Sequence, residues 1–198
     1  RLLLQIKKKN ILNSCTPFDE KSVDLIEKLK FDIIKIASVS SNDFSLLSRV
    51  SKNNIPKIIS TGGLSMENID KIVSFMSHRG QIFSLMHCVA IYPTDEQDMN
   101  LRFINTMKKR YKNLTIGWST HEDPSTSLPG MLAHAMGAQM FEKHIGIGSK
   151  KYKLNNYSVT PLDFEKYLKD MTFSKSILGS KYKKMNKSEA NTLKKLDR

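Results

Sequence analysis

The sequence has little of what disulfide-rich, zinc-binding or membrane-spanning proteins need. Its 198 residues include two cysteines, Cys15 and Cys88, each within an apolar run and without a paired spacing. This argues against a disulfide framework or a zinc knuckle. No run reaches the roughly 20 consecutive apolar residues of a membrane-spanning helix, and residues 1–10 are too basic and interrupted for a signal peptide. We therefore expect a cytoplasmic protein with no membrane partner.

Acidic residues are also scarce. Lys and Arg number 32 against 19 Asp and Glu, for a formal net charge of +13. Such a charge suits nucleic-acid binding. A surface that binds single-stranded nucleic acid, however, needs several aromatic side chains on which bases can stack, next to the basic residues. Only Tyr182 lies within the densest basic segment, residues 181–195. The other basic residues are spread along helical segments, as on a solvated lysine-rich surface, so we expect no nucleic-acid partner.

The sequence does contain a repeated alternation of short apolar runs and helical segments. Six runs are β-branched or apolar and end in polar residues or glycine, as buried parallel strands do. They span residues 11–18, 32–38, 57–63, 83–89, 114–120 and 139–145. Between them apolar residues follow helical spacing, and Asp19, Ser65 and Thr160–Pro161 are suited to begin the first, third and last helices. Each repeat is predicted to be a βα unit.

Polar side chains fall at the C-terminal ends of all six runs. They are Ser14, Cys15, Thr16, Lys35, Ser38, Ser60, Thr61, His87, Ser119, His121, Lys143 and His144. A doubly wound sheet would use only the residues beside its switch point, whereas a barrel gathers every strand end around one mouth. The apolar pattern alone fits both architectures. The contribution of six strands favours an α/β fold of the parallel (β/α)8 TIM-barrel type.

Alternation within the fifth and sixth runs brings two histidines together. Ser119 and His121 share one face of the fifth run, and Glu142 and His144 share one face of the sixth. Right-handed crossovers make these strands neighbours, so the two imidazoles, with Glu142, could hold a divalent metal. The alternatives are two unrelated polar residues at the rim, and a Glu142 that only orients an imidazole. His87 is expected to face the barrel interior.

Lys35 lies inside an apolar strand run. Burial of its ammonium group without a partner would be costly, so we expect it to meet an anion. A substrate phosphate or carboxylate would serve, and an internal acid such as Glu142 is the alternative. The hydroxyl side chains that could surround a bound anion are those of Thr16, Ser38, Ser60 and Ser119.

Six segments in a fixed order carry a family resemblance. They read CTPFDEKSVDLIEKL, DIIKIAS, PKIISTGG, LMHCVAIYPT, IGWSTHE and GAQMFEKHIG. This series resembles the sialic acid synthase family, which includes N-acetylneuraminate, legionaminate and pseudaminate synthases. The resemblance implies that residues 1–172 form about six of the eight βα units of a TIM barrel, with the first two strands missing. Residues 173–198 would then form a basic C-terminal helix or linker toward an absent antifreeze-like domain.

The resemblance also implies a reaction and a set of residue roles. The enzyme would be a C–C bond-forming transferase that condenses phosphoenolpyruvate with an N-acetylmannosamine-like acylamino sugar aldehyde and releases phosphate. It would act as a homodimer at full length, and the fragment alone would be inactive. His121, His144 and Lys35 would be catalytic, with His121 and His144 ligating a manganese-like divalent metal. The implied substrate-binding residues are Thr16, Lys35, Ser38, Ser60, Tyr92 and Ser119, of which Tyr92 would face the sugar.

Departures from the family pattern leave a second interpretation open. Ser40 stands where many members have a glutamate, Ala90 where an asparagine is common, and Thr120 where an aspartate is usual. Leu154-Asn155-Asn156-Tyr157 replaces a Gly-Pro-Asp-His type loop that touches the sugar in the family. The alternative is therefore a non-catalytic barrel descendant that binds anionic ligands or a partner protein in surface-glycan biosynthesis. Neither the acceptor sugar nor the metal follows from the sequence.

Overall fold

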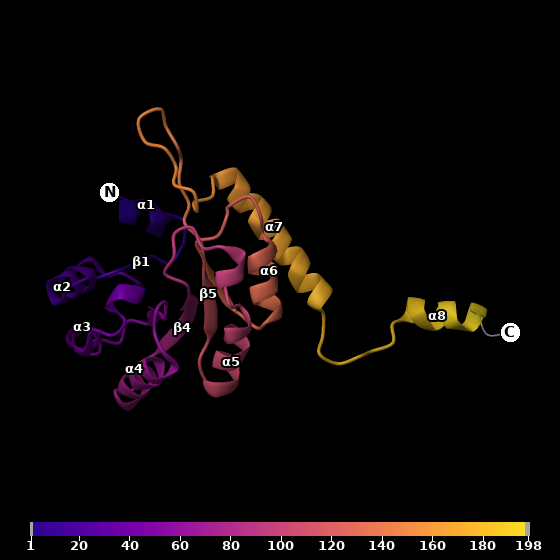
Figure 1. Cartoon of the computed structure of the whole chain (residues 1–198), viewed down its shortest axis with the longest axis horizontal. Helices are drawn as coiled ribbons and strands as arrows, with labels where there is room; N and C mark the ends of the chain where they lie inside the picture. Colours follow the sequence, from indigo (N-terminus) through magenta and orange to yellow (C-terminus); the bar gives the residue numbers. More distant parts are fainter. Residues whose placement is uncertain (1, 197–198) are drawn as a thin grey trace.

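A computed structural model describes residues 2–196, which form a six-stranded parallel sheet with helices packed along its outer side (Figure 1). The strands follow one another in sequence order, β1-β2-β3-β4-β5-β6. They are β1 (Ser14–Cys15), β2 (Ile33–Ile36), β3 (Lys57–Ser60), β4 (Phe83–Cys88), β5 (Ile116–Ser119) and β6 (Met140–Glu142). The helices are α1 (Leu2–Lys8), α2 (Glu20–Leu29), α3 (Phe44–Val50), α4 (Met66–His78), α5 (Arg102–Arg110), α6 (Leu128–Ala135), α7 (Pro161–Leu178) and α8 (Lys187–Leu196). Short 3-10 helices occupy Ser38–Ser40 and Glu96–Asp98.

The sheet is curled into a half-barrel. Neighbouring strands are about 4.8 Å apart, so β2 and β6 would be roughly 19 Å apart in a flat sheet. Yet Lys35 Nζ on β2 lies 2.8 Å from Glu142 Oε2 on β6. Two side chains cannot bridge the flat distance, so the strands must curve around a shared interior. This confirms the predicted TIM-type α/β fold and excludes the doubly wound alternative.

The core lies between the sheet and its helices. One apolar cluster joins sheet residues such as Ile34, Leu85 and Trp118 to residues of α2, α3, α4, α5 and α6. Opposite that layer, β5 presents Gly117, where an added Cβ would meet the Met86 side chain and lie 2.7 Å from the Met140 carbonyl oxygen. Glycine at this position makes room for the Met86 side chain in the interior.

Three predicted helix starts are confirmed. The side chains of Asp19 and Ser65 accept hydrogen bonds from backbone N–H groups in the first turns of α2 and α4. Thr160 forms a capping box with Asp163 at the start of α7, and Pro161 occupies the first turn, where its missing N–H costs nothing.

All six predicted strands are present, but they are shorter than predicted. The run 11–18 forms only the two residues of β1, and Ile11 and Leu12 are 60% and 71% exposed. In the described part of the chain β1 pairs only with β2 and β6 only with β5 in the sheet. The backbone N–H and C=O groups of an edge strand are hydrogen-bonded on one side only. The apolar residues that flank Ser14 and Cys15 therefore do not lengthen β1.

The C-terminal region divides differently from the expectation. Helix α7 runs unbroken to Leu178 and packs on α6, so the boundary expected at residue 173 falls inside a helix. After Gly179 the chain leaves the half-barrel, and α8 has no buried residue (Figure 1). Of the two predicted segments, 1–172 and 173–198, Arg1 and residues 197–198 lie outside the described residues. Within residues 2–196 no helix combines the length and apolar character that crossing a membrane requires.

Candidate functional site

Two imidazole rings meet at the C-terminal ends of β5 and β6. The ring centroids of His121 and His144 are 5.1 Å apart. Tyr92 lies 4.2 Å from the His121 ring, and Tyr157 lies 5.1 Å from the His144 ring, also measured between centroids. The structure therefore brings together His121, His144 and Tyr92, three of the residues singled out in the sequence.

The surroundings of His121 favour a neutral imidazole. The residue is 5% exposed, and its Nδ1 lies 3.3 Å from the carbonyl oxygen of Val89. Burial is the main cause that lowers the pKa of His121 below its ordinary value, and the nearby His144 adds to the effect. Because the Val89 carbonyl oxygen can only accept a hydrogen bond, Nδ1 of His121 carries the proton and donates to it. Nε2 then keeps its lone pair free, as is usual for a metal-ligating histidine.

The spacing of the two rings suits a shared divalent ion. A metal about 2.1 Å from one nitrogen of each ring would place the centroids of two adjacent ligands on the order of 4.5–5.5 Å apart. The separation of 5.1 Å between His121 and His144 falls within that interval. Among residues 2–196 no three His, Cys, Asp or Glu side chains converge on one point. The arrangement thus fits two protein ligands, with the remaining positions left to water and substrate.

Lys35 has an internal partner. Its Nζ donates to Ser60 Oγ at 2.8 Å and lies 2.8 Å from Glu142 Oε2. The Lys35 side chain is 13% exposed and that of Glu142 is 41% exposed. The alternative in which Lys35 pairs with Glu142 is therefore the arrangement in the structure. An anionic substrate would have to share the ammonium group with this carboxylate or displace it.

Hydroxyl and thiol groups line the interior next to Lys35. Ser38 Oγ accepts a hydrogen bond from the Gly62 N–H at 3.1 Å. Ser38 and Ser119 lie near the Cys88 thiol, whose pKa is raised chiefly by burial. An added Cβ at Gly62 would lie 2.7 Å from Ser38 Oγ, so glycine permits this close approach. Thr16 is half-buried just after β1, at the open edge of the sheet.

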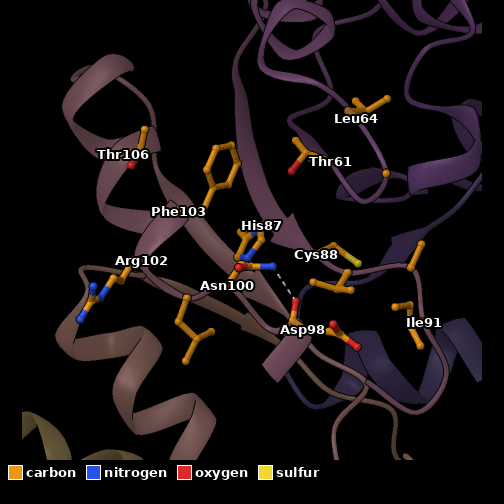
Figure 2. A pocket seen from close by; sticks show the side chains of 14 residues that line it. Thr61, Leu64, His87, Cys88, Ile91, Asp98, Asn100, Arg102, Phe103 and Thr106 are labelled. Atoms are coloured by element: carbon orange, nitrogen blue, oxygen red, sulfur yellow. Dashed lines mark hydrogen bonds between the residues drawn. The ribbon is translucent and has the colours of Figure 1, made fainter. Parts of the chain in front are cut away.

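His87 does not face the barrel interior, so that expectation is wrong. Its Nε2 lies 2.9 Å from the Met99 carbonyl oxygen, and its ring packs against Trp118 and Phe103. Alternation along β4 explains the difference, because His87 is paired with Trp118, which joins the helix-facing apolar core. His87 instead borders a cavity of about 700 Å³ beside α5 (Figure 2). Burial lowers its pKa.

Two sets of contacts in the site were not predicted from the sequence, although the resemblance placed Tyr157 in the loop that would touch the sugar. Tyr157 contacts Tyr92 and both histidines from the loop before α7. Glu122 and Lys143 form a buried ion pair of 2.7 Å, with side chains 1% and 2% exposed. The sequence does contain an indication of this ion pair. Glu122 directly follows His121 and Lys143 directly precedes His144, so opposite charges lie next to the two histidines that were expected to meet.

Sequence comparison supports a family assignment. The profile of the NeuB family matches residues 1–183. N-acetylneuraminate-9-phosphate synthase from Drosophila melanogaster is 32% identical over 167 residues, which amount to 83% of this chain and 44% of that protein. This chain spans about half the length of the curated relatives that it matches.

Structural comparison agrees. A putative spore coat polysaccharide biosynthesis protein E from Chromobacterium violaceum superposes with a TM-score of 0.94 at 43% identity, over 98% of this chain and 58% of that one. N-acetylneuraminic acid (sialic acid) synthetase from Leptospira borgpetersenii, solved with citrate, gives a TM-score of 0.87 at 31% identity, over 96% and 66% of the two chains.

Proposed function

This chain belongs to the NeuB family, and on that premise we propose that the protein carrying it condenses phosphoenolpyruvate with an acylamino sugar aldehyde and releases phosphate. The resemblance of six ordered segments supports this reaction, and the acceptor would be of the N-acetylmannosamine type. The observation that carries the proposal is the meeting of His121 and His144 at 5.1 Å in the same mouth as Lys35. Parallel α/β barrels place their chemistry at this end.

The residues present fit a manganese-like divalent ion, which His121 and His144 would hold through one nitrogen each. When bound, such an ion supplies a Lewis acid that polarises the aldehyde oxygen of the acceptor. The lowered pKa of His121 keeps its imidazole unprotonated near neutral pH, as ligation requires. Tyr92 and Tyr157 form an aromatic wall beside the rings, where the sugar would lie.

The chain's own cation and hydroxyls would hold phosphoenolpyruvate. Lys35 would bind its phosphate or carboxylate, with Ser38, Ser60 and Ser119 as nearby hydroxyl donors and Thr16 at the edge. In the condensation, carbon three of phosphoenolpyruvate bonds to the aldehyde carbon, and water adds to carbon two. The C–O bond to phosphate then breaks, so phosphate leaves and the new keto acid remains. A fixed ammonium group beside the developing charge would stabilise these steps.

Cell location and assembly extend the same proposal. A cytoplasmic homodimer is the form that the family resemblance implies. Because this chain spans about half the length of its curated relatives, the activity, substrates and assembly described here are proposed for the protein that carries it.

The direct test is His121→Ala in that protein. We expect metal-dependent phosphate release from phosphoenolpyruvate and N-acetylmannosamine to be lost, while the far-ultraviolet circular dichroism spectrum is unchanged. His78→Ala is the matched control, because His78 is exposed on α4 and bonds only within its own helix. Turnover in His121→Ala equal to that of the wild type would contradict the proposal.

One observation favours the second candidate, a non-catalytic descendant that binds anions or a partner protein. Ser40, at the position where many family members have a glutamate, is 8% exposed and supplies no carboxylate to the site. Isothermal titration separates the two candidates. A synthase should bind phosphoenolpyruvate more tightly when Mn²⁺ is present, whereas a relic with independent sites should show no such coupling.

A further inference from the structure

A second cavity lies beside the histidine site, on the far side of the turn that follows Tyr92. Its volume is about 310 Å³. Four of the ten residues that line it are acidic and none is Lys or Arg; the acidic residues are Asp95, Glu96, Glu122 and Asp123. In a chain with a net charge of +13, this local excess of carboxylates stands out from the rest of the protein.

Glu122 supplies the buried acceptor of this cavity. The residue is 1% exposed and its Oε1 accepts from Lys143 Nζ at 2.7 Å. Its Oε2 is also buried and has no hydrogen-bond partner within residues 2–196. A buried carboxylate oxygen without a donor is unfavourable, so this atom calls for a donor that enters the cavity. Lys143 balances one carboxylate and leaves the others uncompensated.

The remaining acidic side chains line the same cavity at its exposed rim. Asp95, Glu96 and Asp123 are exposed, and none of them belongs to an ion pair of the described chain. Asp123 Oδ1 accepts from the Ser125 N–H at 2.8 Å, which holds the carboxylate in one orientation. The cavity thus combines one desolvated acceptor with an anionic rim, an arrangement that attracts a cation.

The geometry favours an organic cation over a bare metal. Unlike the histidine site, this cavity has no imidazole in its lining, and within residues 2–196 no three His, Cys, Asp or Glu side chains converge on one point. A volume of about 310 Å³ lies at the lower end of the range of small-molecule sites. Thr94, Thr126 and Asn156 add hydroxyl and amide groups to the lining, and such groups suit a ligand that also carries hydroxyls.

We propose that this cavity binds the ammonium group of a small amino sugar, with Glu122 Oε2 as the buried acceptor and Asp95, Glu96 and Asp123 as the outer charges. Glu122 adjoins His121 and Asn156 adjoins Tyr157, so the bound ligand lies next to the histidine site. The inference goes beyond the proposed condensation, because the cavity would bind its ligand whether or not that reaction occurs.

Isothermal titration with two matched sugars tests the proposal in the protein that carries this chain. D-glucosamine, which is cationic, should bind about tenfold or more tightly than the neutral N-acetyl-D-glucosamine, since a charge-assisted hydrogen bond is lost with the acetyl group. Glu122→Gln, which keeps the shape of the side chain, should remove this preference. If Glu122→Gln does not fold, the double variant Asp95→Asn/Asp123→Asn at the exposed rim should still weaken glucosamine binding.

Asp98→Asn is the control, because Asp98 lies in the same 3-10 helix as Glu96 but lines the other cavity (Figure 2). It makes the same change in charge and should leave glucosamine binding unaltered. Equal binding of the two sugars would overturn the proposal. So would a loss of glucosamine binding in Asp98→Asn as large as that in Glu122→Gln, or Mg²⁺ binding that depends on Glu122. His121→Ala should abolish phosphate release and keep glucosamine binding, so failure of one proposal is distinct from failure of the other.

Discussion

The buried ion pair between Glu122 and Lys143 makes a quantitative prediction about stability. The two side chains are 1% and 2% exposed and 2.7 Å apart. Lys143→Met would leave the Glu122 carboxylate buried without its counter-charge, and breaking a buried pair in this way costs about 3–5 kcal/mol. We therefore expect the free energy of unfolding, measured by urea titration with circular dichroism, to fall by about that amount.

A double variant separates charge from packing. Glu122→Met/Lys143→Met removes both charges, and replacement of a buried pair by apolar side chains is often neutral, so its loss should be at most about 1 kcal/mol. Lys169→Met is the surface control, because Lys169 and Glu165 form a solvent-exposed pair on α7, and its loss should cause no measurable change. A double variant as unstable as Lys143→Met would refute the reasoning, since the cost would then come from lost packing.

Two further predictions concern the sheet. Burial lowers the pKa of Lys57 to about 8, and its ammonium group donates to the Asn53 carbonyl and the Gln81 amide oxygen, both neutral. Between pH 8 and 10.5 the unfolded chain then binds more protons than the folded one. The free energy of unfolding should therefore rise with pH by roughly 3 kcal/mol relative to that of Lys57→Met. Urea titrations in which the two proteins show the same pH dependence across that window would contradict this prediction. Gly117→Ala should lower stability by about 1–3 kcal/mol in thermal unfolding, because its Cβ would lie 2.7 Å from the Met140 carbonyl oxygen; an unchanged melting temperature would show that the strands can separate at little cost.

The sequence was sufficient for the strands because their pattern depends on local chemistry. The run 83–89, for example, is buried along most of its length and rich in apolar residues, as expected of a parallel strand that is covered on both faces. Alternation also predicted correctly that His121 and His144 approach each other. The expectation that His87 faces the barrel interior was wrong, because the same alternation along β4 pairs His87 with Trp118 and puts it on the helix side.

Side-chain partners across the interior were harder to predict. Lys35 could meet either a substrate or Glu142, and the choice depends on how far the sheet curls, which no single strand encodes. In the structure β2 and β6 curl close enough for a 2.8 Å contact. The resemblance placed Tyr157 in a loop that would touch the sugar. Its contacts with the two histidines could not be predicted, because residue spacing in an irregular loop carries no information about side-chain direction.

The proposed reaction requires that His121 and His144 ligate one ion together. Titration of the protein with Mn²⁺, followed by the electron paramagnetic resonance signal of the free ion, would count the sites in the wild type, in His121→Ala and His144→Ala, and in the double variant. We predict one site per chain, lost to a similar degree in each single variant, with little further loss in the double variant. Wild-type affinity in either single variant would contradict the shared site.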